Sequence, residues 1–76
     1  MREVECSLEA SAYLQDSWPY TEPVLHALIA LRTRDPLPGI QIEPGVYLWE
    51  TVQHTIIYER KGPHLRVTVI KPDADI

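Results

Sequence analysis

The sequence predicts an α+β domain that consists of one strand, two short helices and then a three-stranded antiparallel meander. Residues 45–71 contain three runs rich in β-branched and aromatic residues, separated by short polar breaks. One alternating segment and two segments with helical spacing precede them. Both helices are expected to pack on one face of the sheet. A chain of 76 residues has room for one core, so residues 1–76 are expected to form a single domain.

The first strand and the first helix are predicted at the start of the chain. Residues 3–7 alternate between acidic and small or apolar side chains, as in a half-buried strand. Ser7 can cap a helix over residues 8–15, because its hydroxyl can accept a hydrogen bond from a free amide in the first turn. The residues expected to face inward are Leu8, Ala12 and Tyr13. Pro19 ends this region, since proline disfavours the helical conformation of the preceding residue.

The second helix is expected to begin after Thr21, a candidate N-cap, and to end near Arg32 or Arg34. Glu22 and Pro23 both suit a first turn. Its apolar stripe contains Val24, Leu28 and Leu31, and Leu25 and Ile29 widen it. Residues 35–39 contain two prolines and a glycine, which end the helix. Residues 40–42 are then expected to form an extended piece or a short edge strand.

The meander is predicted to have an aliphatic face and an aromatic face. The aliphatic face, expected to pack on the helices, contains Val46, Leu48, Val52, Ile57, Leu65, Val67 and Val69. Together with the helices it predicts a core of Leu28, Leu31, Leu48, Ile57, Val67 and Val69. The opposite face carries Tyr47, Trp49, Tyr58 and Arg66, with Arg60 and His64 close to the turn over residues 61–64.

This aromatic and cationic face is the candidate binding surface. Such surfaces stack bases and bind phosphates, or they anchor a protein partner. An exposed Trp–Tyr patch is unfavourable in a lone monomer and more often marks an interface, so a protein partner or a homodimer is expected. The alternative is that a further element covers these side chains for purely structural reasons.

Composition excludes several other classes of function. The net charge of −4 argues against broad binding to phosphate backbones. The single Cys6 rules out an internal disulfide and fits a reducing cytoplasm, and no apolar run is long enough to span a membrane. The histidines, His26, His54 and His64, lack the spacing of metal ligands. We therefore expect a cytoplasmic chain with no metal, no cofactor and no membrane contact.

The chain resembles the RelE/ParE superfamily of bacterial toxins. The resemblance rests on the helix over residues 24–31 with the Asp-Pro-Leu-Pro-Gly segment after it, and on the Gly-opened strand that starts at Gly45. It also rests on the run His-Thr-Ile-Ile-Tyr-Glu-Arg from His54, and on the closing run Leu-Arg-Val-Thr-Val-Ile from Leu65. The resemblance implies a toxin-like component of a toxin–antitoxin system, held by an antitoxin-like protein or by a second copy.

The resemblance also defines candidate catalytic residues. Where the ribonuclease branch of the family carries arginines on the sheet, this chain has Tyr47, Trp49 and Thr55. The remaining matches are Tyr58, Arg60 and Arg66, with Tyr47, Trp49 and His64 as binding candidates. With so few such groups, ribonuclease activity is expected to be weak or lost, and nucleic-acid binding weak. The alternative is a non-catalytic protein-interaction module that uses the aromatic sheet face.

Overall fold

The computed structural model describes residues 1–51 and 53–73. In chain order, the elements are β1 (Val4–Cys6), α1 (Leu8–Asp16), α2 (Glu22–Leu31), β2 (Ile40–Glu43), β3 (Val46–Thr51), β4 (His54–Lys61) and β5 (His64–Pro72). Within these described residues, five strands form one mixed sheet in the order β1-β5-β4-β3-β2. The strand β1 runs parallel to β5, and the other neighbours are antiparallel.

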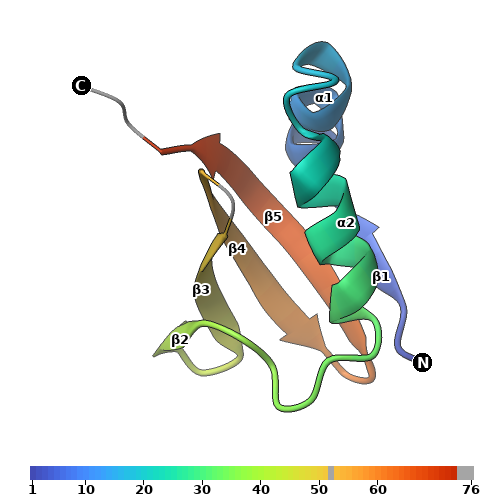
Figure 1. Cartoon of the computed structure of the whole chain (residues 1–76). Coiled ribbons are helices and arrows are strands. Elements are labelled where there is room, and N and C mark those ends of the chain that lie inside the picture. The colour runs from blue at the N-terminus through green and yellow to red at the C-terminus, as the bar shows by residue number, and fades with distance from the viewer. Residues whose placement is uncertain (52, 74–76) are drawn as a thin grey trace.

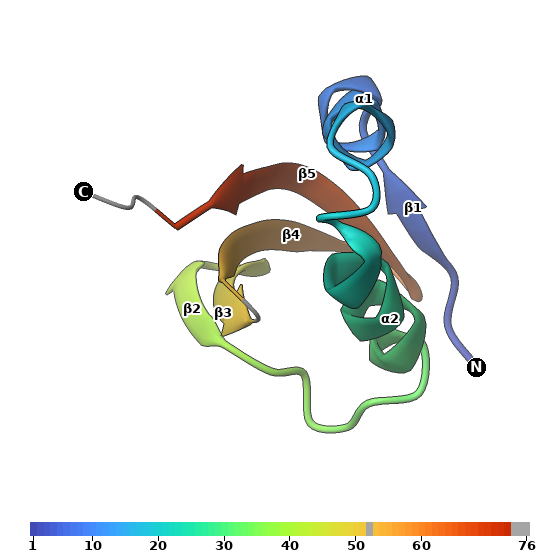
Figure 2. The same cartoon turned by 45° about the horizontal axis from the view of Figure 1, so that its top comes forward.

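The predicted α+β class and the meander are confirmed. Of the two conformations expected for the segment after the Pro-rich loop, the edge strand is the correct one, and it forms β2 beside β3. The first strand joins the other edge of the sheet through a parallel pairing in which Val4 lies opposite Leu65. Figure 1 shows α2 crossing the sheet, and Figure 2 shows the sheet curving around it. Both helices pack against one face, which we call the helix-facing side.

Hydrogen bonds at the helix ends hold α1 and α2 against the sheet. Ser7 caps α1 as predicted, because its Oγ accepts from the Ala10 amide at 3.1 Å. The same hydroxyl donates to the Thr68 carbonyl of β5 at 3.0 Å. Thr21 precedes α2 but makes no capping bond; its Oγ1 donates instead to the Leu14 carbonyl at 2.7 Å. The two hydroxyl groups therefore tie α1 to β5 and α2 to α1.

The inward face of α1 differs from the prediction. Leu8 is 90% exposed and Ala12 is also exposed, whereas Ala10 is buried and Tyr13 and Leu14 pack beside it. The bond from Ser7 to β5 brings the first turn close to the sheet and sets the rotation of the helix. A small side chain at position 10 permits that close approach, while Leu8 is turned towards solvent.

Half of the predicted core is correct. Leu28, Leu31 and Val67 are buried, and the remaining buried hydrophobic residues are Ala10, Val24, Ile56, Tyr58, Leu65 and Ile70. The prediction was wrong for Leu48, Ile57 and Val69, which are only partly buried. On β4, Ile56 and Tyr58 face the helices, so Ile57 faces away from them. The predicted inward position of Val52 lies outside the described residues.

A β-bulge in β5 explains part of this difference. Ile57 lies opposite Val69, but Tyr58 lies opposite Val67, so Thr68 is an extra residue on β5. The alternation of faces therefore shifts by one residue after Val67. Val69 faces outward and Ile70 becomes buried, the reverse of what strict alternation predicts.

Within the described residues, neither helix is long and apolar enough to cross a lipid bilayer.

Candidate functional site

The structure does not bring the predicted aromatic and cationic residues together on one open face. Tyr58 is 0% exposed, and the rings of Tyr47 and Trp49 pack beside it against the core. The Tyr47 ring stacks on Tyr58 with centroids 5.2 Å apart, and Trp49 meets Tyr58 edge-on at 6.5 Å. Arg66 lies opposite Glu59 on the other side of the sheet and is exposed. The prediction that these residues share an open surface is therefore wrong.

Tyr58 can be buried because its hydroxyl finds a partner. The hydroxyl donates a hydrogen bond to the Pro38 carbonyl, which belongs to the loop between α2 and β2. Burial and the neighbouring Tyr47 raise the pKa of Tyr58, while Arg2 and Arg34 oppose the change, and the result is a pKa of about 12. At neutral pH the phenol is protonated and fastens the loop to the sheet. Such a high pKa is poorly matched to proton transfer near neutral pH.

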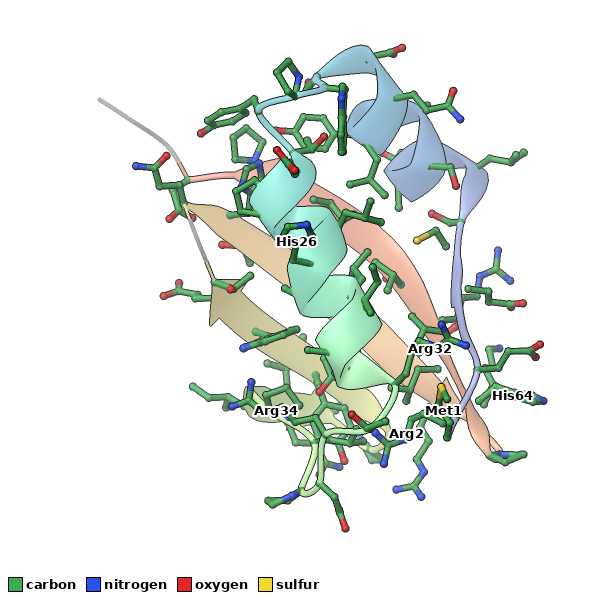
Figure 3. The ribbon with its side chains drawn as sticks, turned by 45° about the vertical axis from the view of Figure 1, so that its right-hand side comes forward. Met1, Arg2, His26, Arg32, Arg34 and His64 are labelled. Carbon is green, nitrogen blue, oxygen red and sulfur yellow. The ribbon has the colours of Figure 1, made fainter. Side chains whose placement is uncertain are left out.

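Four basic side chains gather where α2 ends and β1 begins. Figure 3 shows Arg2, Arg32, Arg34 and His64 near this end of the molecule. The Arg2 guanidinium donates to the Leu31 carbonyl at 2.8 Å and to the Arg34 carbonyl at 2.6 Å. A cation at this position satisfies the carbonyl of Leu31, the last residue of α2, and complements the helix dipole.

Arg34 and His64, at the same end of the molecule, also have identifiable neighbours. The Arg34 guanidinium carbon lies 5.7 Å from the centre of the Trp49 ring, within range of a cation–π interaction. His64 Nδ1 lies 3.4 Å from the Glu3 carboxylate. An open groove of about 670 Å³ lies here, lined by Met1, Arg2, Glu3, Arg32, Pro63 and His64. His64 is thus exposed, but Trp49 and Tyr47 lie on the core side.

The predicted catalytic residues are also separated. Arg60 lies opposite Leu65, which is buried, so it belongs to the helix-facing side of the sheet near its exposed end. Arg66 lies on the outer face, and Tyr58 is covered. No one substrate phosphate can contact all three side chains in this arrangement.

An apolar groove runs between the two helices and β1, and sequence reasoning did not identify it. One part, of about 440 Å³, is lined by Leu14, Gln15, Trp18 and Leu25. A second part, of about 340 Å³, continues past Leu14 and Leu25 to Val4, Cys6, Leu28, Ile29 and Arg32. Trp18 is 51% exposed and Ile29 is 53% exposed. We call this surface the α1–α2 groove.

A signal for the α1–α2 groove was present in the second helix. Its apolar stripe includes Leu25 and Ile29 as well as Val24, Leu28 and Leu31. A helix that covers one face of a sheet buries a stripe of limited width. In the structure Val24, Leu28 and Leu31 fill that stripe, so Leu25 and Ile29 are left at the surface.

The three histidines lie in different environments. His26 is exposed on α2 (Figure 3), His64 is exposed as the first residue of β5, and His54 is buried at the start of β4. The Tyr13 hydroxyl lies 2.9 Å from His54 Nε2, and the Tyr20 ring packs on the imidazole at 5.0 Å. In the described part of the chain, no three His, Cys, Asp or Glu side chains are placed to hold a metal ion.

Cys6 faces the α1–α2 groove but is not an activated nucleophile. Burial raises the pKa of its thiol, and the neighbouring Glu5 carboxylate raises it further. Since the thiolate is the reactive form, this environment favours an inert side chain that packs against the core.

Comparison with known proteins identifies the fold. No protein-family model and no curated protein matches this sequence. Among solved structures, the chain is similar to a chain of the chromosomal ParDE toxin–antitoxin system from P. aeruginosa, with a TM-score of 0.73 and 13% sequence identity. The superposition covers 97% of this chain and 98% of that chain. This protein therefore has the fold of a ParDE-system chain along almost its whole length.

Proposed function

We propose that this chain is the toxin-like component of a toxin–antitoxin pair, that a protein partner holds it, and that it cleaves RNA weakly or not at all. The likeness in fold to a ParDE-system chain supports the first part. The α1–α2 groove supports the second part, and it is the observation that carries the proposal. The separation of Tyr58, Arg60 and Arg66 supports the third. A pair of this kind acts in the cytoplasm.

The α1–α2 groove has the character of a protein-binding surface. Trp18, Leu25 and Ile29 expose large apolar side chains in a continuous hollow, which is unfavourable in water without a partner. An amphipathic helix buries its apolar face in such a groove, with anchors one helical turn apart. We therefore assign the antitoxin-like partner to this groove and not to the aromatic residues of the sheet.

Charge and the positions of the candidate residues support the proposal of weak or absent ribonuclease activity. The net charge is −4, so little attraction for a phosphate backbone is expected. Tyr58 is buried and protonated, and Arg60 and Arg66 lie on opposite sides of the sheet. Few groups are then available to stabilise the charge that develops on a scissile phosphate. Arg60 and Arg66 remain the candidates for any residual cleavage.

The second candidate function is a non-catalytic interaction module. The aromatic residues of the sheet do not supply its binding surface, because Tyr47, Trp49 and Tyr58 pack against the core. The module would instead bind its protein partner through the α1–α2 groove. Growth arrest on expression distinguishes the two functions, because a module without a toxic target leaves growth unchanged.

The test combines growth with partner binding. The chain is expressed in a bacterial host with and without the small protein encoded beside it, and growth, translation and message cleavage are followed. We expect a stable complex with that protein and little message cleavage. Robust codon-specific cleavage that Arg66→Ala abolishes would refute the loss of activity.

The same complex tests the position of the partner. Ile29→Asp places a charge in the α1–α2 groove and should weaken the complex by about tenfold or more. Ala30→Asp is the matched control, because Ala30 is exposed in the same helical turn but does not line the groove. Equal binding by both variants would show that the partner does not use this groove.

A further inference from the structure

The outer face of the sheet, on the side away from α1 and α2, carries a continuous apolar row. The register places Ile40, Leu48, Ile57 and Val69 side by side across β2, β3, β4 and β5. Ile40 is 70% exposed, and the other three are partly buried by their neighbours on the strands. In residues 1–51 and 53–73, no helix or strand forms a second layer over this row.

A charged row lies directly beside the apolar row. Glu50 on β3, Thr55 on β4 and Lys71 on β5 lie opposite one another in the register. They line a groove of about 420 Å³ together with Leu48, Ile57, Pro72 and Asp73. Glu50 and Lys71 are exposed, and neither forms an ion pair within the described part of the chain. Glu50 therefore stands on the β3 side of β4 and Lys71 on the β5 side, and a second acid, Asp73, lies beside Thr55 and accepts a hydrogen bond from its Oγ1 at 3.2 Å.

We propose that two copies of this chain associate face to face through this surface, about a twofold axis parallel to β4. Such an axis places β3 of one copy over β5 of the other and β4 over β4. Both copies then use the same surface, so the contact is isologous. Leu48 of one copy then faces Val69 of the other, and Ile57 faces Ile57. Glu50 of each copy faces Lys71 of the other, which gives two equivalent ion pairs at the rim of the apolar row.

The charges favour this axis over the alternative. The row of Lys71 and the row of Arg66 flank the apolar row on its two sides. A twofold axis along the apolar row would exchange these two flanking rows, so Lys71 of one copy would face Arg66 of the other. Like charges that face each other across an interface are unfavourable. The axis along β4 brings two Glu59 side chains together instead, but each carboxylate already lies 3.4 Å from its own Lys61.

Sheet geometry separates the Glu59 side chains further. Aligned sheets pack about 10 Å apart and cross at about −30°, so the twofold axis follows the bisector of the two β4 strands, and the strands diverge away from the centre of contact. If the contact is centred between Ile57 and Thr55, the Glu59 end of the strands lies where the two sheets separate. The ion pairs between Glu50 and Lys71 lie close to the centre.

The size of the surface predicts a weak dimer. Four strands about 4.8 Å apart and about 20 Å long give a footprint of about 400 Å². A standard stable interface buries about 800 Å² on each partner. The association should therefore depend on concentration, with a dissociation constant in the micromolar range or above. The surface lies across the sheet from the α1–α2 groove, so this inference does not depend on the proposed function.

Sedimentation velocity on the full chain, from about 5 µM to about 1 mM, tests the proposal. We expect reversible dimers in the wild type. Glu50→Lys and Lys71→Glu should each raise the dissociation constant by about tenfold, and the double variant should restore it to within about threefold. Asp16→Lys is the matched control: it changes the net charge as Glu50→Lys does, but lies on α1.

Each contrary outcome overturns the proposal. A wild type that stays monomeric at the highest concentration shows that this surface does not drive self-association. If neither Glu50→Lys nor Lys71→Glu weakens the dimer, the dimer uses another surface. The same conclusion holds if Ile29→Asp dissociates the dimer. If both single variants weaken the dimer but the double variant does not restore it, the pairing of Glu50 with Lys71 is wrong. Glu50 and Lys71 are exposed, so circular dichroism should show a native fold in every variant.

Discussion

Tyr58→Phe removes one buried hydroxyl, and its effect on stability should change sign with pH. At neutral pH the wild type should be more stable by about 1 kcal/mol, because the variant loses the hydrogen bond to the Pro38 carbonyl. The phenol has a pKa of about 12 in the folded chain, above the value of about 10 in an unfolded chain. The folded state therefore holds this proton more tightly than the unfolded state between these two values.

The size of the pH effect follows from the shift in pKa. Below pH 10 the phenol is protonated in both states and its contribution is complete. As the pH rises to 12, the unfolded state ionises first, so the free energy of unfolding falls. A shift of about two units corresponds to about 2–3 kcal/mol. Phenylalanine does not titrate, so the variant should become more stable than the wild type by about 1–2 kcal/mol near pH 12.

Urea unfolding followed by circular dichroism measures this difference at fixed pH between 8 and 12. The other ionisable side chains are the same in both proteins, so the difference between wild type and Tyr58→Phe reports Tyr58 together with its interaction with the neighbouring Tyr47. Absorbance at 295 nm should show an ionisation step near pH 12 in the wild type that is missing in the variant. A stability difference that stays constant across this range would refute both the burial and the raised pKa of Tyr58.

Two further predictions concern the core and the loop that carries Pro38. Leu28→Ala should lower the free energy of unfolding by about 2–5 kcal/mol, since Leu28 is buried between α2 and the sheet. A loss below about 1 kcal/mol would show that Leu28 is not in the core. Gly39→Ala should cost more than Gly45→Ala by about 1–3 kcal/mol. Both glycines have positive φ, but only at Gly39 would a Cβ meet backbone, 2.5 Å from the Leu48 carbonyl oxygen. Equal losses in thermal or urea unfolding would contradict this close approach.

The order and type of the elements could be predicted because their signals are local. Ser7 has the side chain that a helix N-cap needs, and the bond to Ala10 forms within one turn. The stripe of Val24, Leu28 and Leu31 repeats at helical spacing and is buried as expected. The three runs of the meander are joined by short breaks, so neighbouring strands pair with each other. The core faces of β4 and β5 beyond the bulge were less predictable.

The sequence by itself determined the fold class and the principal helix, since these depend on residue type and short-range spacing. Only the tertiary structure decided which sheet residues face the helices. Tyrosine and isoleucine suit either face of a strand, and Tyr58 is buried because a distant loop supplies the Pro38 carbonyl for its hydroxyl. The bulge at Thr68 then reverses the faces of Val69 and Ile70. The α1–α2 groove likewise needs β1 to pair with β5 across about sixty residues of chain, and no local pattern encodes such a contact.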